Sequence, residues 1–402
     1  MKIIKQLSIA IVSDLHCTSS DDQKVSHLMS HTHRNPKLHH PVEALKNLIN
    51  ENQVKSDVVL CPGDVTDKID PTGFHVGWEY IQEIGRDLGT NMIIASLGNH
   101  DLDSRNKDPN QSEPTYSAKN INDNYPFEGD TSKYWKDHFD LINLDDLIIL
   151  NINSCASHLS PIYSDGKFVD VKTSLDETTL EKISEKIENL DKDKFKIALL
   201  HHHPNQYSDL ILSSYKDRDI LQGGDKLLKE LQSKSFDIVV HGHKHVPRFI
   251  VENDLPVFCS GSFSSLQNLQ ETDSKNTFHL LNLMIVEKAD GSKENVGELL
   301  TWEFTKGHGW AKTTDLNSKI EHRIGFGLNN DLNQLADNIY NYAHVGDLKI
   351  IELEDLYDQF SSVKYLSPFQ MEKLFSLLKN KHGYSKGMEE DGSTILIKKR
   401  DG

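Results

Sequence analysis

Short apolar runs that stop abruptly at polar residues recur along the first 245 residues of the chain. The runs at 7–12, 57–61, 92–97, 195–200 and 236–240 have the length and continuous apolarity of strands buried on both faces of a sheet. Stretches with apolar residues at roughly 3.6-residue spacing lie between several of these runs, at 41–49, 74–88, 175–190 and 225–233. This alternation predicts an α/β sheet with crossover helices.

After residue 245 the pattern changes to strands without helices, at 248–251, 256–259, 278–286 and 299–304. We expect these strands to form a second sheet that packs on the first. From about residue 316 the chain becomes helical again, at 328–342, 352–360 and 368–381, and a strand-like run follows at 394–397. Three short helices followed by a hairpin resemble a winged helix.

The chain has 402 residues, which is more than the roughly 250 to 300 that a single core accommodates. We therefore expect a large domain at 1–314 and a small C-terminal domain at 315–402. The small domain is predicted to be a winged helix or a module for protein interaction or self-association.

Each buried run of the first part ends in residues that can bind a metal. The five motifs are Asp14-Leu15-His16, Gly63-Asp64-Val65-Thr66-Asp67, Gly98-Asn99-His100-Asp101, His201-His202-His203-Pro204 and Gly242-His243-Lys244-His245. In an extended strand end, two residues at the spacing of Asp14 and His16 point to the same side. Mixed oxygen and nitrogen ligands suit Mn, Fe or Zn better than Ca or Mg.

We interpret the five motifs as one binuclear centre in which Asp64 bridges two divalent or trivalent ions, with Mn favoured and Fe or Zn as alternatives. Two ions about 3.5 to 4 Å apart acidify a shared water to hydroxide and stabilise an in-line displacement at phosphorus. Phosphoester hydrolysis is the natural use of such a centre.

At these residues the sequence resembles the calcineurin-like metallophosphoesterase superfamily. The DxH, GDxxD, GNH(D/E), H and GHxH blocks occur in the same order from Asp14 to His245, and the resemblance covers about three quarters of the chain. It implies a two-sheet α/β core, an α+β sandwich flanked by helices, and it does not extend to the C-terminal tail.

The resemblance also implies a role for each motif residue. One metal would be held by Asp14, His16, Asp64 and His245, and the other by Asp64, Asn99, His202 and His243. His202 is preferred because it stands two residues before Pro204, although His201 and His203 remain alternatives. His100 would protonate the leaving oxygen while Asp101 orients its imidazole, an arrangement that contributes about 10² to 10⁴ in rate.

The residues in and next to the motifs differ between branches of the superfamily. Protein Ser/Thr phosphatases carry Arg-Gly after the second block, whereas here Lys68-Ile69 follows Asp67. The wording is closer to the branch that contains cyclic-nucleotide phosphodiesterases. We therefore predict a phosphodiesterase that acts on a nucleotide-like or other small phosphodiester. The alternatives are a nuclease subunit, whose C-terminal domain recruits substrate or a partner protein, and a phosphomonoesterase.

The composition limits the binding partners and the cellular location that we expect for the protein. The formal net charge of −17 disfavours nucleic acid, because lysine and arginine supply most non-specific affinity for its backbone. The chain has four cysteines without CxxC spacing, Cys17, Cys61, Cys155 and Cys259, which are predicted to be reduced and packed. No run approaches the roughly 20 apolar residues of a membrane span, and no signal peptide is evident. A cytoplasmic location is expected.

Overall fold

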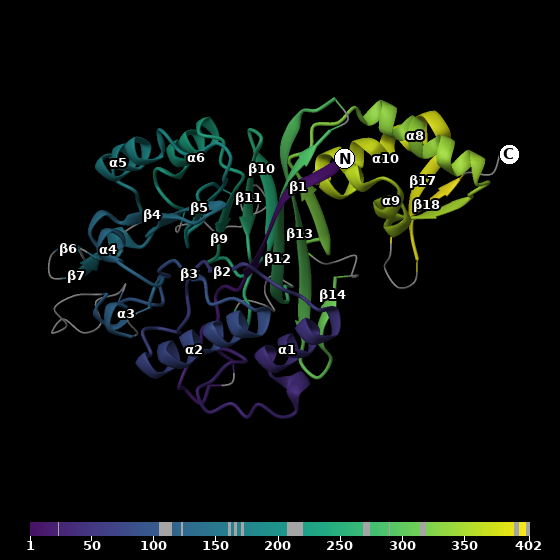
Figure 1. Ribbon diagram of the computed structural model, residues 1–402. Helices are drawn as coiled ribbons and strands as arrows, with labels where there is room; N and C mark the ends of the chain where they lie inside the picture. The colour runs from purple at the N-terminus through teal and green to yellow at the C-terminus, as the bar shows by residue number, and fades with distance from the viewer. Residues whose placement is uncertain are drawn as a thin grey trace. The chain divides into compact units, whose positions relative to one another are not determined.

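The computed structural model describes residues 1–22, 24–103, 115–121, 124–159, 162–164, 167–169, 173–206, 220–267, 274–288, 290–313, 319–389 and 394–398 (Figure 1). Most of its strand residues lie in two mixed sheets, with helices packed against them, and this confirms the predicted α/β core. Among the described residues, no helix combines the length and apolarity that a membrane crossing requires.

The first sheet has the strand order β14-β13-β12-β1-β2-β3, and β15 also pairs with β13. Its strands are β1 Lys2–Ile11, β2 Val58–Cys61, β3 Ile93–Ala95, β12 Asn276–Glu287, β13 Lys293–Thr305, β14 Gly309–Lys312 and β15 Arg323–Phe326. Strands β1, β2 and β3 run parallel to one another. Their carboxyl ends therefore lie at one edge of this sheet.

The second sheet has the order β10-β11-β9-β8-β5-β4. Its strands are β4 Phe139–Asn143, β5 Leu147–Ile152, β8 Phe195–Leu199, β9 Ile238–His241, β10 Arg248–Glu252 and β11 Leu255–Cys259. Strands β5, β8, β9 and β11 are parallel, and the antiparallel strands β4 and β10 form the two edges. A hydrogen bond from the Asn151 side chain to the Ala95 carbonyl, 2.7 Å long, joins β5 to β3 of the first sheet.

The helices begin and end at strong local signals. Helix α1, Pro41–Asn52, and helix α2, Pro71–Leu88, both begin with proline, and α2 is capped by Asp70 and ends at Gly89 in the left-handed conformation. Figure 1 shows α1 and α2 side by side. Helices α5, Glu177–Ile187, and α6, Gly224–Ser233, share one apolar core with β5, β8, β9 and β11.

Smaller elements connect these parts. They are α3 Tyr116–Asn120, α4 Ser132–Asp137, the 3-10 turns Lys37–His39 and Ala156–Leu159, and a two-stranded hairpin of β6 Ile162–Ser164 and β7 Lys167–Val169.

The chain divides into two compact units by its internal contacts. One comprises Ser8–Leu280 and Trp302–Ala311, and the other comprises Met1–Leu7, Leu281–Thr301 and Lys312–Gly402. The second unit therefore takes parts of β1, β12 and β13 as well as the tail. The predicted domain boundary between 314 and 315 lies outside the described residues and stays a prediction.

The tail part of the second unit has the order helix, strand, helix, helix, hairpin. Its elements are α8 Leu332–Val345, β16 Ile350–Glu352, α9 Leu353–Gln359, the 3-10 turn Ser361–Tyr365, α10 Pro368–His382, β17 Tyr384–Met388 and β18 Thr394–Lys398. The three strands form an antiparallel sheet in the order β16-β18-β17. The predicted order of three helices followed by a hairpin is present among the described residues, and the short strand β16 was not predicted.

One sequence expectation about the sheets is wrong. The strands after residue 245 do not form a sheet of their own: β10 and β11 extend the second sheet beside β9, while β12 and β13 extend the first sheet beside β1. The pairing partners lie far apart in the sequence, so the local pattern of apolar residues could not identify them.

Candidate metal centre

The five motifs lie in the loops that follow the parallel strands β1, β2, β3, β8 and β9. Strands β1, β2 and β3 are neighbours in one sheet, and β8 and β9 are neighbours in the other. Ligands of α/β sheets characteristically bind at the carboxyl ends of the strands. The structure brings these five loops together at this end.

The motif glycines allow the loops to approach one another closely. A Cβ atom on Gly98 would lie 2.1 Å from the backbone nitrogen of Asp64, and one on Gly242 would lie 2.4 Å from Oδ2 of Asp14. Gly63 has a φ of +112°, which side chains other than hydrogen rarely permit. These three positions therefore need glycine so that the carboxylates can reach the centre.

Five candidate ligands themselves adopt the left-handed backbone conformation. The φ angles are 52° for Asp14, 48° for His16, 52° for Asp64, 76° for His243 and 56° for His245. This region is uncommon for residues other than glycine, and residues held in it cluster at functional sites. This backbone strain indicates that the loops have a functional role in addition to connecting strands.

Asp14, His16, Asp64 and His245 form a buried first cluster. His16 Nε2 lies 2.9 Å from His245 Nε2 and 3.4 Å from Asp64 Oδ2, and His245 Nε2 lies 3.4 Å from Asp14 Oδ1. Donor atoms that share one cation at about 2.1 Å are themselves about 3 Å apart. The spacing of these four side chains therefore fits a single ion.

A second cluster contains Asp64, Asn99, His201 and His243. His201 Nε2 lies 3.0 Å from Asn99 Oδ1, 3.4 Å from Asp64 Oδ2 and 3.2 Å from His243 Nδ1. Asn99 Oδ1 is also 2.9 Å from His243 Nδ1. Since Asp64 Oδ2 is equally close to His16 and His201, this carboxylate belongs to both clusters.

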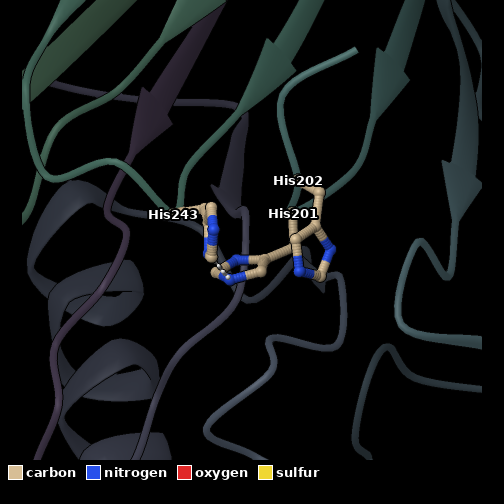
Figure 2. Close-up of side chains that lie close together, drawn as sticks. All are labelled: His201, His202 and His243. Atoms are coloured by element: carbon tan, nitrogen blue, oxygen red, sulfur yellow. Dashed lines mark hydrogen bonds between the residues drawn. The ribbon is translucent and has the colours of Figure 1, made fainter. Parts of the chain in front are cut away.

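The His201 and His202 side chains point in different directions. Figure 2 shows the imidazoles of His201 and His202 beside that of His243, with a dashed line joining His201 to His243. The ring centroids of His202 and His243 are 4.5 Å apart, and those of His201 and His243 are 5.0 Å apart. His202 Nδ1 faces the hydroxyl of Ser154 at 2.9 Å. His202 still lies close enough to His201 and His243 for the three to share an ion, but the contacts to Asn99 and Asp64 are made by His201.

The hydrogen bonds of the outer ring nitrogens determine which nitrogen faces the centre. His201 Nδ1 donates to the Pro62 carbonyl at 2.9 Å, and His245 Nδ1 faces the Gln267 carbonyl at 3.3 Å. Because each outer nitrogen carries a proton in these contacts, Nε2 is the nitrogen of each ring that can face an ion. Such second-shell contacts orient metal-binding histidines.

Electrostatics also favour a cation in the centre. Burial, together with the neighbouring His100, lowers the pKa of His16 to about 4, and burial holds the pKa of His243 well below its usual value. Burial would lower the pKa of His201 as well, but the Asp64 carboxylate outweighs it and raises this pKa to about 9. The centre therefore combines the neutral imidazoles of His16 and His243 with carboxylates that attract positive charge.

His100 is oriented by Asp67 and not, as the sequence predicted, by Asp101. His100 Nδ1 lies 3.1 Å from Asp67 Oδ1. The backbone nitrogens of Lys68 and Ile69, the two residues after Asp67, also contact His100. Burial would lower the pKa of His100, but Asp64 and Asp67 raise it above its usual value. The raised pKa favours the protonated imidazole that a general acid needs.

Asp101 instead links the loops of the second and third motifs through hydrogen bonds. Its carboxylate accepts hydrogen bonds from the backbone nitrogens of Thr66, at 3.0 Å, and Gly98, at 2.9 Å. It is fully buried, and burial together with the Asp64 charge raises its pKa to about 7. The prediction failed because adjacency in the sequence was taken for adjacency of the side chains.

The four cysteines are free thiols and all are buried, as predicted. Burial raises the pKa of Cys17 to about 12 and that of Cys259 to about 11. Buried thiols with raised pKa values are poor nucleophiles and poor metal ligands. They are packing residues beside the centre.

Comparison with known proteins agrees with the family that the motifs resemble. Residues 7–247 match the family model of calcineurin-like phosphoesterases, which is more than half of the chain. No curated protein sequence matches the chain significantly.

Several solved structures are similar at low identity. A purple acid phosphatase from yellow lupin (Lupinus luteus) seeds is 12% identical over 74% of this chain and 51% of that chain, with a TM-score of 0.45. A putative 5'-nucleotidase from Staphylococcus aureus is 12% identical over 72% and 52%, with a TM-score of 0.39. Phosphopantetheinyl hydrolase from Mycobacterium tuberculosis is 12% identical over 66% and 92%, with a TM-score of 0.37. The chain spans about half the length of the first two.

Proposed function

The chain belongs to the calcineurin-like phosphoesterase family, and from this premise we propose that it is a binuclear metal-dependent phosphodiesterase that acts on a nucleotide-like or other small phosphodiester. The coarser activity, metal-dependent hydrolysis of a phosphoester, follows from the family itself. The proposal concerns the kind of ester, the metals and the residues that hold them.

One observation carries the proposal: acceptor atoms face one another at the centre. His16 Nε2 and His245 Nε2 are 2.9 Å apart, and the outer nitrogen of each ring is engaged with an acceptor, the Asp67 carboxylate for His16 and the Gln267 carbonyl for His245. Two unprotonated nitrogens at this distance repel each other unless a cation lies between them. The residues therefore fit a metal ion.

We assign His201, in place of the predicted His202, to the second ion together with Asp64, Asn99 and His243. The assignment rests on the contacts of His201 Nε2 with Asn99 and Asp64. Bound ions would supply an acidified water as nucleophile and positive charge opposite the phosphoryl oxygens. Mn²⁺ remains the favoured ion because the ligands mix carboxylate, amide and imidazole groups.

The protein's own residues perform the proton transfer and hold the reacting groups in place. His100 donates a proton to the leaving oxygen, and Asp67 holds its imidazole from the opposite side through Nδ1. The Asp64 carboxylate fixes the loop of His100 as well, because its Oδ1 accepts from the His100 backbone nitrogen at 2.8 Å. The general acid and the bridging ligand are thus placed by the same loop contact.

A small substrate is preferred for two reasons. The motif that ends in Lys68-Ile69 differs from that of protein phosphatases, and the net charge of −17 works against a polyanionic chain. A nuclease is the second candidate, and the winged-helix order of the tail is the observation that favours it. We further propose a cytoplasmic location, since four free buried thiols are typical of a reducing compartment.

The activity is tested by hydrolysis of bis(p-nitrophenyl) phosphate and of p-nitrophenyl phosphate in Mn²⁺, before and after chelation. We expect metal-dependent cleavage that favours the diester and is lost in Asp64→Ala. Preference for the monoester would make the protein a phosphomonoesterase. Faster cleavage of single-stranded DNA than of cyclic nucleotides would favour the nuclease.

The adjacent histidines provide a matched test of the ligand assignment. His201→Ala should lose one of two bound metal ions and at least about 10²-fold in kcat, the scale for a single group that stabilises transition-state charge. His202→Ala should retain both ions, because its ring contacts Ser154. Metal analysis of the two purified variants decides between them, and the reverse pattern would restore His202 as the ligand.

A further inference from the structure

We propose that Gln267 is a positioning residue that couples the proton donor His100 to the metal ligand His245. The inference rests on the proposed function, because it assigns Gln267 a part in the same general-acid step. Gln267 lies 200 residues after Asp67 in the sequence and belongs to none of the five motifs.

The side chain of Gln267 contacts the carboxylate that orients His100. Its Nε2 donates to Asp67 Oδ1 at 2.9 Å, and the same oxygen lies 3.1 Å from His100 Nδ1. The amide donor is neutral, so it fixes the carboxylate without cancelling the negative charge that His100 needs. The amide therefore restricts the positions that Asp67 Oδ1 can take beside the His100 imidazole and beside His16 Nδ1, which lies 3.5 Å from the same oxygen.

The backbone of the same residue contacts the metal ligand. The Gln267 carbonyl faces His245 Nδ1 at 3.3 Å, and this contact leaves His245 Nε2 as the acceptor that points toward Asp14 and His16. One residue thus sets both the tautomer of a ligand and the position of the acid's partner.

Gln267 can perform this role because its loop is fixed to the first motif. The Ser262 hydroxyl donates to the Asp14 carbonyl at 2.7 Å, and the Ser264 hydroxyl donates to the Leu15 carbonyl at 2.7 Å. The Gln267 backbone nitrogen donates to the Ser265 hydroxyl at 3.2 Å. The residue is only partly buried, so its substitution leaves no large cavity.

The test separates proton donation from metal binding by varying only the leaving group. Methyl p-nitrophenyl phosphate has a good leaving group and methyl phenyl phosphate has a poor one, and the matching monoesters are run in parallel. The full-length Mn²⁺ enzyme is compared with Gln267→Leu, with the near-isosteric Gln267→Glu, and with Gln82→Leu as a control on α2.

We expect Gln267→Leu to lose about 10-fold in kcat on the phenyl ester and less than about 2-fold on the p-nitrophenyl ester, a part of the 10² to 10⁴ of general-acid catalysis. Both metal ions and KM should be retained. Gln267→Glu should lose more on the phenyl ester, because its carboxylate repels Asp67, and Gln82→Leu should match the wild type.

Equal loss on both esters, or loss of a metal ion, would show a merely structural role for Gln267 and overturn the inference. His100→Ala provides the reference for the mechanism. If His100→Ala itself fails to discriminate between the leaving groups, the general acid of the proposed function is wrong. If it discriminates and neither Gln267 variant does, only the inference about Gln267 is wrong.

Discussion

The metal centre and the tail part of the second unit are built from opposite kinds of local structure. At the centre, five candidate ligands adopt positive φ angles and buried carboxylates lie among imidazoles. In the tail, α10 begins at a Ser367 capping box with Pro368 at its first position and ends at Gly383 in the left-handed conformation. Each signal in α10 agrees with its structure, as in an element selected for stability.

This difference predicts where a single substitution should change several properties at once. At the centre one side chain serves several neighbours, so metal binding, activity and stability should change together. In the tail, the apolar core of α8, α9, α10 and the hairpin is assembled from separate, conventional contacts. Substitutions there should change stability alone, by small and additive amounts.

Asp64→Asn should have the largest effect. The Asp64 carboxylate is equidistant from a ligand of each cluster, at 3.4 Å from His16 and from His201, so its loss removes the shared anionic ligand of both ions. We expect kcat to fall by at least about 10²-fold and Mn²⁺ no longer to raise the melting temperature, which in the wild type reports binding to the folded state. Retention of both ions in Asp64→Asn would contradict the bridging role.

Gly98→Ala should affect the centre and the stability at the same time. The new Cβ would lie 2.1 Å from the Asp64 backbone nitrogen, so the two loops must separate. We expect a loss of about 3 kcal/mol in the free energy of unfolding, at the upper end for point substitutions, together with loss of activity.

Gly89→Ala is the matched control for Gly98→Ala. Gly89 also has a positive φ, of 87°, but a Cβ there meets nothing within 4 Å. The left-handed conformation alone should cost about 1 to 2 kcal/mol, and activity should be unchanged. Denaturant unfolding and diester assays on the two variants measure both effects, and similar activity losses would contradict the loop-contact explanation.

The sequence assigned Asp14, His16, Asp64 and His245 to one ion, and the structure brings these four side chains together. Each of them follows a strand end, and strand ends are local features. It favoured His202 over His201. The orientation of His201 depends on the Pro62 carbonyl, which lies 139 residues away in the sequence and accepts a hydrogen bond from the His201 ring. It also chose Asp101 over Asp67 as the partner of His100. That choice depends on the left-handed turn at Lys68 and Ile69, which no residue type there indicates.

The same distinction applies to the fold. The caps and apolar spacing of α1, α2 and α10 are local, and their predicted positions agree with the structure within a few residues. The membership of β12 and β13 in the first sheet depends on the pairing of β12 with β1, more than 260 residues earlier. Gln267 illustrates the same limit at the site, since both its contacts are to distant loops.

His279 is buried without a neighbouring carboxylate among the described residues, so its pKa should be shifted in the direction opposite to that of His201. His279 is fully buried against Phe258, and burial lowers its pKa to about 3. The unfolded state therefore binds a proton below pH 6.5 that the folded state excludes, so stability is present above this pH and is lost as the pH falls. The contribution lost at pH 4.5 is about 2 to 3 kcal/mol.

His279→Gln removes the titrating group while keeping an amide that can donate to the Ser260 carbonyl, the present partner of His279. The free energy of unfolding of this variant, measured by urea denaturation at pH 7 and pH 4.5, should fall by about 2 kcal/mol less than that of the wild type. An identical fall in the two proteins would contradict the assignment of a lowered pKa to His279.

Ser367→Ala in the tail should have the smallest effect. The Ser367 hydroxyl accepts from the Gln370 backbone nitrogen, and the Gln370 side chain accepts from the Ser367 nitrogen at 2.8 Å. Loss of the cap should cost about 1 kcal/mol and leave the metal content and kcat unchanged. Ser376→Ala, at an exposed position of the same helix, should be neutral or stabilising by a few tenths of a kcal/mol. A loss of activity in Ser367→Ala would mean that the tail and the metal centre are coupled, and the contrast between the two regions would then fail.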